Sequence, residues 1–167
     1  ALIISIEAPT YSSTGMFDGF MQHFERVEMI NWQALRFNGG YDFMWQSIFN
    51  TCEAFKFDLI FIQLQQGEAV PAEKVKELSA YAPVINYTED VREDIGWIED
   101  MHPYLALSVF TNMEDVEKMQ TLGFNSMYHH VPYNHIWYRP KPKTSTNYGD
   151  IVFLGNNYKD NPLNFPM

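Results

Sequence analysis

Cysteine is almost absent from this sequence, which contains the single residue Cys52. One cysteine excludes an internal disulfide and fits a reducing compartment, so we expect a cytoplasmic protein. Cys52 lies among apolar residues at helical spacing. That pattern favours a buried structural thiol over a nucleophile.

Basic residues and long apolar runs are also scarce. The chain has 11 Lys and Arg residues against 21 Asp and Glu residues, for a net charge of -10. This charge repels phosphate backbones and disfavours non-specific binding of nucleic acid. No apolar run approaches the roughly 20 residues that span a bilayer, so no transmembrane segment is predicted. The first ten residues have neither a basic start nor a long apolar run, and we do not expect a signal peptide.

Apolar and aromatic residues are abundant, at 46% and 16% of the chain, and predict a packed globular domain. Apolar runs of strand length alternate with segments of helical spacing. The expected strands are residues 2–6, 27–32, 58–64, 84–87, 105–110 and 126–131, and the clearest expected helices are residues 16–24, 41–55, 71–82 and 112–122. This alternation predicts an α/β fold, a Rossmann-like open parallel sheet with helices on both faces.

The stretch 83–101 has the strongest chemical character. Its strand ends in a polar run that contains Asp90, and Arg92 follows two residues later. Ligands of open parallel sheets bind outside the carboxyl ends of the strands, where both side chains are expected. The alternative is that Asp90 only caps a helix and that Arg92 is a solvated charge.

The first strand leads into a second candidate region. Glu7 follows this strand, and a small polar loop then precedes a helix; the loop ends in Ser12, Ser13, Thr14 and Gly15. A strand, a polar loop and a helix together offer backbone N–H groups to an anion. The loop has one glycine and matches neither nucleotide-binding fingerprint. Asn112 follows another strand and is a plausible N-cap.

The histidines do not predict a metal site. His129 and His130 are adjacent on an expected strand, so their side chains point to opposite faces and cannot easily share a metal ion. No cysteine partner and no helical His-x-x-x-His pair accompanies them. We therefore expect neither a metal nor another cofactor.

The composition changes after residue 138. Residues 139–149 are rich in Pro, Lys, Ser and Thr, as in a linker. Residues 150–154, DIVFL, then have the pattern of a strand that leads into Gly155 and Asn156. We expect one domain over residues 1–138, a linker over 139–149 and the incomplete start of a second α/β domain over 150–167.

Three segments carry a resemblance to a known family: VINYTEDVRED, LALSVFTNMEDVEKMQTLGFNSMYHHVPYNHIWYRP and DIVFLGNNY. Their order resembles that of GT-B type glycosyltransferases, in the group with a spore-maturation-protein-like C-terminal region. The resemblance covers roughly the second half of the chain, whereas the first half fits the fold alone. It implies that residues 1–138 are the acceptor-side domain and that nearly all of the donor domain is absent from these residues.

The resemblance also implies a function. The full protein would move a sugar from a nucleotide-sugar donor to the hydroxyl of an acceptor that we cannot name. Asp90, and Glu7 second, would be the catalytic base, and Gly155 and Asn156 would bind the donor. Residues that border the cleft on the substrate side would be Ser12, Ser13, Thr14, Gly15, Arg92 and Asn112. The alternative is a non-catalytic α/β ligand-binding or protein-interaction module.

Overall fold

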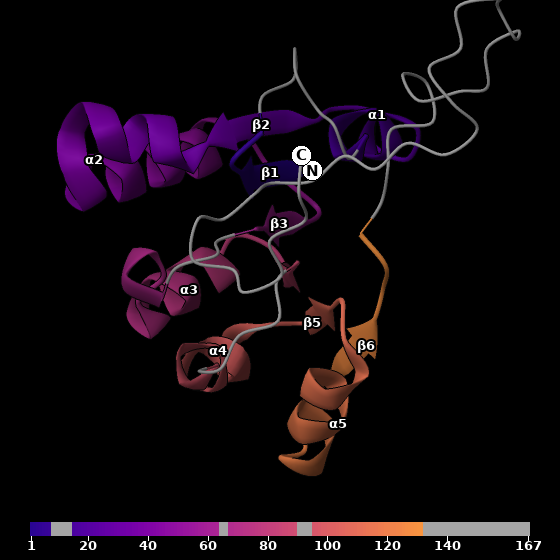
Figure 1. The fold of residues 1–167 in the computed structure, drawn as a ribbon. Coiled ribbons are helices and arrows are strands. Elements are labelled where there is room, and N and C mark those ends of the chain that lie inside the picture. Colours follow the sequence, from indigo (N-terminus) through magenta and orange to yellow (C-terminus); the bar gives the residue numbers. More distant parts are fainter. Residues whose placement is uncertain (8–14, 64–66, 90–94, 132–167) are drawn as a thin grey trace, which may run out of the picture.

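The computed structural model describes residues 1–7, 15–63, 67–89 and 95–131. They form a six-stranded sheet in which every neighbouring pair of strands is parallel, in the order β2-β1-β3-β4-β5-β6 (Figure 1). The strands are β1 (Leu2–Ser5), β2 (Glu28–Asn31), β3 (Ile60–Ile62), β4 (Val84–Thr88), β5 (Leu107–Phe110) and β6 (Ser126–Tyr128). The predicted α/β class and parallel sheet are confirmed.

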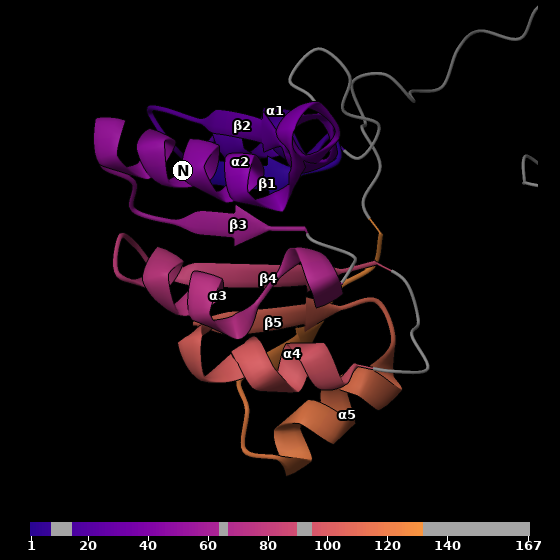
Figure 2. The ribbon, with the colours of Figure 1, turned by 90° about the vertical axis from the view of Figure 1, so that its left-hand side faces the viewer.

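Helices connect these strands. They are α1 (Met16–Met21), α2 (Trp32–Ala54), α3 (Ala72–Ser79), α4 (Gly96–Met101) and α5 (Met113–Thr121), with short 3-10 turns η1 (Gly67–Ala69) and η2 (His102–Tyr104). In Figure 2 the helices α2, α3, α4 and α5 lie in front of the sheet. Among the described helices, α1 packs on the opposite face. Helices thus lie on both faces, but very unevenly.

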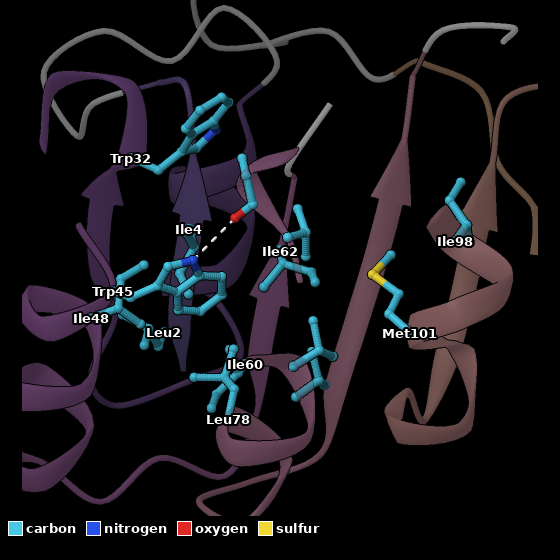
Figure 3. Close-up of a cluster of buried hydrophobic side chains, with 14 of the residues drawn as sticks. Leu2, Ile4, Trp32, Trp45, Ile48, Ile60, Ile62, Leu78, Ile98 and Met101 are labelled. Atoms are coloured by element: carbon cyan, nitrogen blue, oxygen red, sulfur yellow. Dashed lines mark hydrogen bonds between the residues drawn. The ribbon is translucent and has the colours of Figure 1, made fainter. Parts of the chain in front are cut away.

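Strand alternation divides the core into two clusters. In β1, Leu2 and Ile4 pack with the residues of α2 to α5, whereas Ile3 packs with the residues of α1. The larger cluster contains fully buried side chains from strands and helices (Figure 3), among them Ile62, Leu78 and Ile98. Parallel strands covered on both faces have continuous apolar sequences, which accounts for the run at residues 2–4.

The predicted break at residues 38–40 is a kink rather than a boundary. Helix α2 begins at Trp32, where the Asn31 side chain accepts a hydrogen bond of 2.9 Å from the amide N–H of Ala34. At Gly40 the backbone has φ 77° and ψ -176°, a conformation that is essentially limited to glycine. The second half continues, with Trp45 donating from Nε1 to the carbonyl of Ala69 at 3.2 Å (Figure 3). The helical first half was missed because the glycine pair resembled a stop signal.

Other elements agree with the predicted ones within a few residues. Asn112 is the N-cap of α5, and Gly123, with φ 82°, follows its C-terminal end, both as expected. No helix in the described part of the chain is both long and apolar enough to cross a membrane. The predicted linker at 139–149 and the strand at 150–154 lie outside the described residues.

Candidate functional site

The strand order reverses direction between β1 and β3. From β1 the chain moves outward to β2, whereas from β3 it moves the other way, to β4, β5 and β6. The chain therefore leaves the carboxyl ends of β1 and β3 in opposite directions along the sheet. In open α/β sheets this is where ligands bind.

Three polar residues meet at this reversal point. Ser5, at the end of β1, donates from Oγ to Oε1 of Gln63, just after β3, at 2.7 Å. The backbone N–H of Glu7 donates to the same Ser5 Oγ at 3.0 Å. All three residues are buried, and Glu7 is 8% exposed. The backbone of Glu7 is thus held at the carboxyl end of β1 by the Ser5 side chain.

A second group of buried polar side chains lies on the other face of the sheet, because Asn86 is aligned with Ile62, which faces α2 to α5, whereas Ser5 and Gln63 follow Ile4 and Ile62 by one residue. Asn86 of β4 donates from Nδ2 to Thr88 Oγ1 at 3.1 Å and lies opposite Ser108 of β5 in the strand register. Among the described residues, Asn86 Oδ1 and Ser108 Oγ have no hydrogen-bond partner. Buried polar atoms are normally paired. These two atoms are therefore polar groups within the larger core and are separate from the Ser5 and Gln63 pair.

The carboxyl ends of β4 and β5 are joined by a short polar contact. Thr111, which follows β5, donates from Oγ1 to the backbone carbonyl of Glu89 at 2.5 Å. The next residue, Asn112, accepts at Oδ1 from the amide N–H of Asp115 at 2.8 Å and donates from Nδ2 to Asp115 Oδ2 at 2.6 Å. Both ends of the Asn112 amide are therefore engaged in capping α5.

The predicted site residues that the structure describes lie at one edge of the sheet. Glu7 follows β1, Gly15 precedes α1 with φ 72°, and Asn112 follows β5, all at the carboxyl edge. Glu89 at the end of β4 brings the chain to the same edge. The other predicted site residues lie outside the described residues: Ser12, Ser13, Thr14, Asp90, Arg92, Gly155 and Asn156.

No family model, curated protein or solved structure matches this chain.

The sheet face that carries α1 holds an apolar cavity of about 550 Å³. Side chains from four neighbouring strands line it: Phe61, Ile85, Leu107 and Met127. Helix α1 forms one wall through Met16 and Phe20, and His129 lies at the carboxyl end. The cavity is therefore apolar, unlike the carboxyl ends of β1 and β3 with Ser5, Gln63 and Glu7.

Tyr87 connects the cavity with the carboxyl edge. It is 3% exposed, and its hydroxyl donates to the backbone carbonyl of His130 at 3.4 Å. Burial, reinforced by the nearby Glu89 carboxylate, raises the pKa of Tyr87 above its ordinary value. The phenol therefore stays protonated and acts as a donor.

His129 and His130 follow β6, which ends at Tyr128, and do not belong to the strand that was predicted for residues 126–131. His129 lines the apolar cavity, whereas the His130 ring packs edge-on against Tyr128, with ring centroids 4.9 Å apart. Within the described ranges, no group of three His, Cys, Asp or Glu side chains is arranged to hold a metal ion. Cys52 is buried, and burial raises the pKa of its thiol to about 11, which disfavours the reactive thiolate.

Sequence reasoning missed Ser5, Gln63 and Tyr87. Ser5 interrupts the apolar run at residues 2–6, and Gln63 follows a buried strand directly. A polar residue at the carboxyl end of an apolar strand is the signal that identifies both. Tyr87 was assigned to the strand core, and its contact with His130 depends on how the chain turns after β6.

Proposed function

We propose that residues 1–138 are the acceptor-side domain of a glycosyltransferase that moves a sugar from a nucleotide-sugar donor to an acceptor hydroxyl. The observation that carries the proposal is the buried Glu7 at the point where the strand order reverses. The carboxyl ends of the strands at such a reversal are the expected ligand site of an open parallel sheet. The sequence resemblance supplies the reaction class.

Each proposed role follows from the chemistry of the transfer. An acceptor hydroxyl needs to be held in line with the donor carbon, and a carboxylate base removes its proton if the enzyme inverts the anomeric centre. Asp90 and Glu7 are the candidate bases. Backbone N–H groups of the loop that ends at Gly15, together with Gly155 and Asn156, would stabilise the diphosphate leaving group.

A non-catalytic α/β binding module is the second candidate. It is favoured by Asn112, whose amide is engaged at both ends within the α5 cap. In a binding module the edge residues cap helices and hold a ligand, and no group needs to act as a base. Ligand binding without chemistry would then be the whole activity.

Binding experiments on the 167-residue chain test the proposal. Amide chemical shifts would be followed while the chain is titrated separately with a panel of glycans and with a panel of nucleotide sugars. We expect a glycan to shift the amides of Glu7, Gln63 and Thr111 at the carboxyl edge. Glu7→Gln removes the charge but keeps the shape, and we expect it to weaken glycan binding several-fold.

Two outcomes would count against this function. Shifts confined to the opposite edge of the sheet, near Leu59, Ala106 and Asn125, would place the ligand away from the carboxyl edge. Binding of the same glycan by Glu7→Gln with unchanged affinity would remove Glu7 from the site. Arg26→Gln, on the loop that leads into β2 beside Ala1 at the opposite edge, is the control and should bind as the parent chain does.

A further inference from the structure

Carboxamide side chains stand at the carboxyl ends of β2, β3 and β5, and each brings an N–H donor group and an acceptor oxygen. Asn31, the last residue of β2, uses both, because Nδ2 donates to the Ile6 carbonyl at 2.7 Å and Oδ1 accepts from Ala34. Both ends of the Asn112 amide are engaged in the cap of α5. These two side chains therefore hold the chain turns at the sheet edge.

Gln63, which follows β3, is different. Its Oε1 accepts from the Ser5 hydroxyl at 2.7 Å, but none of the hydrogen bonds between described residues uses Nε2. The side chain is buried, with 1% of its surface exposed. Buried polar groups are normally paired. An amide with two unused N–H donors, at the edge where open parallel sheets bind ligands, therefore indicates a ligand.

The direction of these two donors is fixed by the surrounding hydrogen bonds. The backbone N–H of Gln63 donates to the Ile4 carbonyl at 2.8 Å, so the residue is still paired with β1. Ser5 holds Oε1, and in a planar carboxamide Nε2 then points away from Ser5. Ser5 also accepts from the backbone N–H of Glu7. Gln63, Ser5 and Glu7 thus form one hydrogen-bonded unit where the strand order reverses.

This unit is better suited to a hydroxyl group than to an anion. A hydroxyl oxygen can accept from Nε2 of Gln63, and a neighbouring hydroxyl of the same sugar ring can donate to a carboxylate. A phosphate could also accept from Nε2. However, the net charge of -10 and the presence of Glu7 in the same unit disfavour a phosphate at this position. The expected partner of Gln63 is therefore a neutral sugar.

We propose that Gln63 recognises the acceptor, and that its Nε2 donates to a hydroxyl oxygen of a neutral sugar. This inference rests on the proposed function, because it assigns a contact within the acceptor site. Ser5 has a positioning role, since it holds the other end of the Gln63 amide. A sugar at this position pairs the N–H donors that the described chain leaves unused.

The variant Gln63→Glu separates the donor from the rest of the side chain. Glutamate keeps the side-chain length and an oxygen that accepts from Ser5, but a second oxygen replaces the NH2 group. The probes are the glycans of the titration above, used at about pH 8, where the new carboxyl group is ionised. We expect about ten-fold weaker binding. Gln46→Glu, the same substitution at an exposed position of α2, is the control and should bind as the parent chain does.

Two further measurements distinguish recognition from a purely structural role. Hydrogen exchange of the Glu7 amide should be as slow in Gln63→Glu as in the parent, because Ser5 keeps its acceptor. In the parent chain, the side-chain NH2 signals of Gln63 should move when the glycan is added. Those of Asn31, whose amide is engaged at both ends, should stay in place. This second measurement needs no variant and therefore does not depend on the stability of Gln63→Glu.

The possible failures differ in what they contradict. If a glycan binds at the carboxyl edge of the parent, but the Gln63 NH2 signals do not move or Gln63→Glu binds with unchanged affinity, the inference is wrong and the proposed function stands. If no glycan of the panel binds the parent chain, whatever the nucleotide sugars do, the proposed function and the inference are both wrong.

Discussion

His102 is the clearest pH-sensitive residue in the described part of the fold. Its ring is buried and stacks on Phe124 with centroids 4.0 Å apart, and Nε2 lies 3.2 Å from the carbonyl of Asn125. Burial lowers the pKa of His102 below its ordinary value. The unfolded chain, with a histidine pKa of about 6.5, therefore binds this proton more tightly than the folded protein.

Stability should consequently fall on acidification. The contribution of His102 is fully present above about pH 6.5 and is lost as the pH falls toward the folded-state pKa. His102→Gln keeps an N–H donor for the Asn125 carbonyl but does not titrate. Between pH 7 and pH 5, the free energy of unfolding of His102→Gln should decrease less than that of the parent chain, as measured by urea denaturation.

His23→Gln, at an exposed position, is the control. If the free energy of unfolding of His102→Gln changes with pH as steeply as that of the parent, the prediction is wrong.

Single residues also show how far the site could be predicted. Glu7 and Asn112 were identified because each follows an apolar strand, and both lie at the carboxyl edge. The sequence pattern did not show which hydrogen bonds these residues make. The capping bonds of Asn112 depend on Asp115, and the Ser5 and Gln63 contact joins residues 58 positions apart. Such contacts are set by strand pairing, which is not encoded in local spacing.

At the scale of the element, Gly40 allows α2 to bend. Its φ of 77° with ψ near 180° is strained for any residue with a Cβ, although a Cβ at this position would have nothing within 4 Å. Gly40→Ala should therefore destabilise the fold through the backbone alone. The expected loss is about 1–3 kcal/mol in the free energy of unfolding, measured by chemical denaturation.

A neighbouring position separates strain from helix propensity. Asn38 is exposed and lies within the helical first half of α2. Asn38→Ala should leave the stability unchanged or raise it slightly, because alanine is the better helix former. A Gly40→Ala variant as stable as Asn38→Ala would mean that the kink is not required.

The elements themselves were largely predictable. Apolar runs identified all six strands to within a few residues, since the strands of a parallel sheet are buried on both faces. The first half of α2 was missed because its apolar face, with Trp32 and Leu35, is narrow and precedes two glycines. In the first half of α2, packing against the sheet stabilises the helix although two glycines follow it.

At the scale of the molecule, sequence patterns did not predict the order of the strands in the sheet. Alternating strands and helices predict a parallel sheet, but they do not say where the order reverses. The reversal between β1 and β3 determines both the expected ligand site at the strand ends and the uneven helix coverage. The candidate site at the carboxyl edge and the apolar cavity on the α1 face both follow from that single topological feature.

The whole described fold should unfold as one unit, because both core clusters share the same six paired strands. Ile4 is fully buried in the larger cluster, together with Trp32 and Trp45. Ile4→Ala removes buried methyl groups and should lower the free energy of unfolding by about 2–5 kcal/mol. Phe37→Ala, at a 91% exposed position, should change the free energy of unfolding by no more than about 0.5 kcal/mol.

The unfolding of Ile4→Ala in urea tests whether the described fold is one cooperative unit. The midpoints from tryptophan fluorescence and from far-ultraviolet circular dichroism should move together, because the substitution destabilises all strands of the sheet at once. Two separated midpoints in Ile4→Ala would instead show that the clusters on the two faces unfold independently.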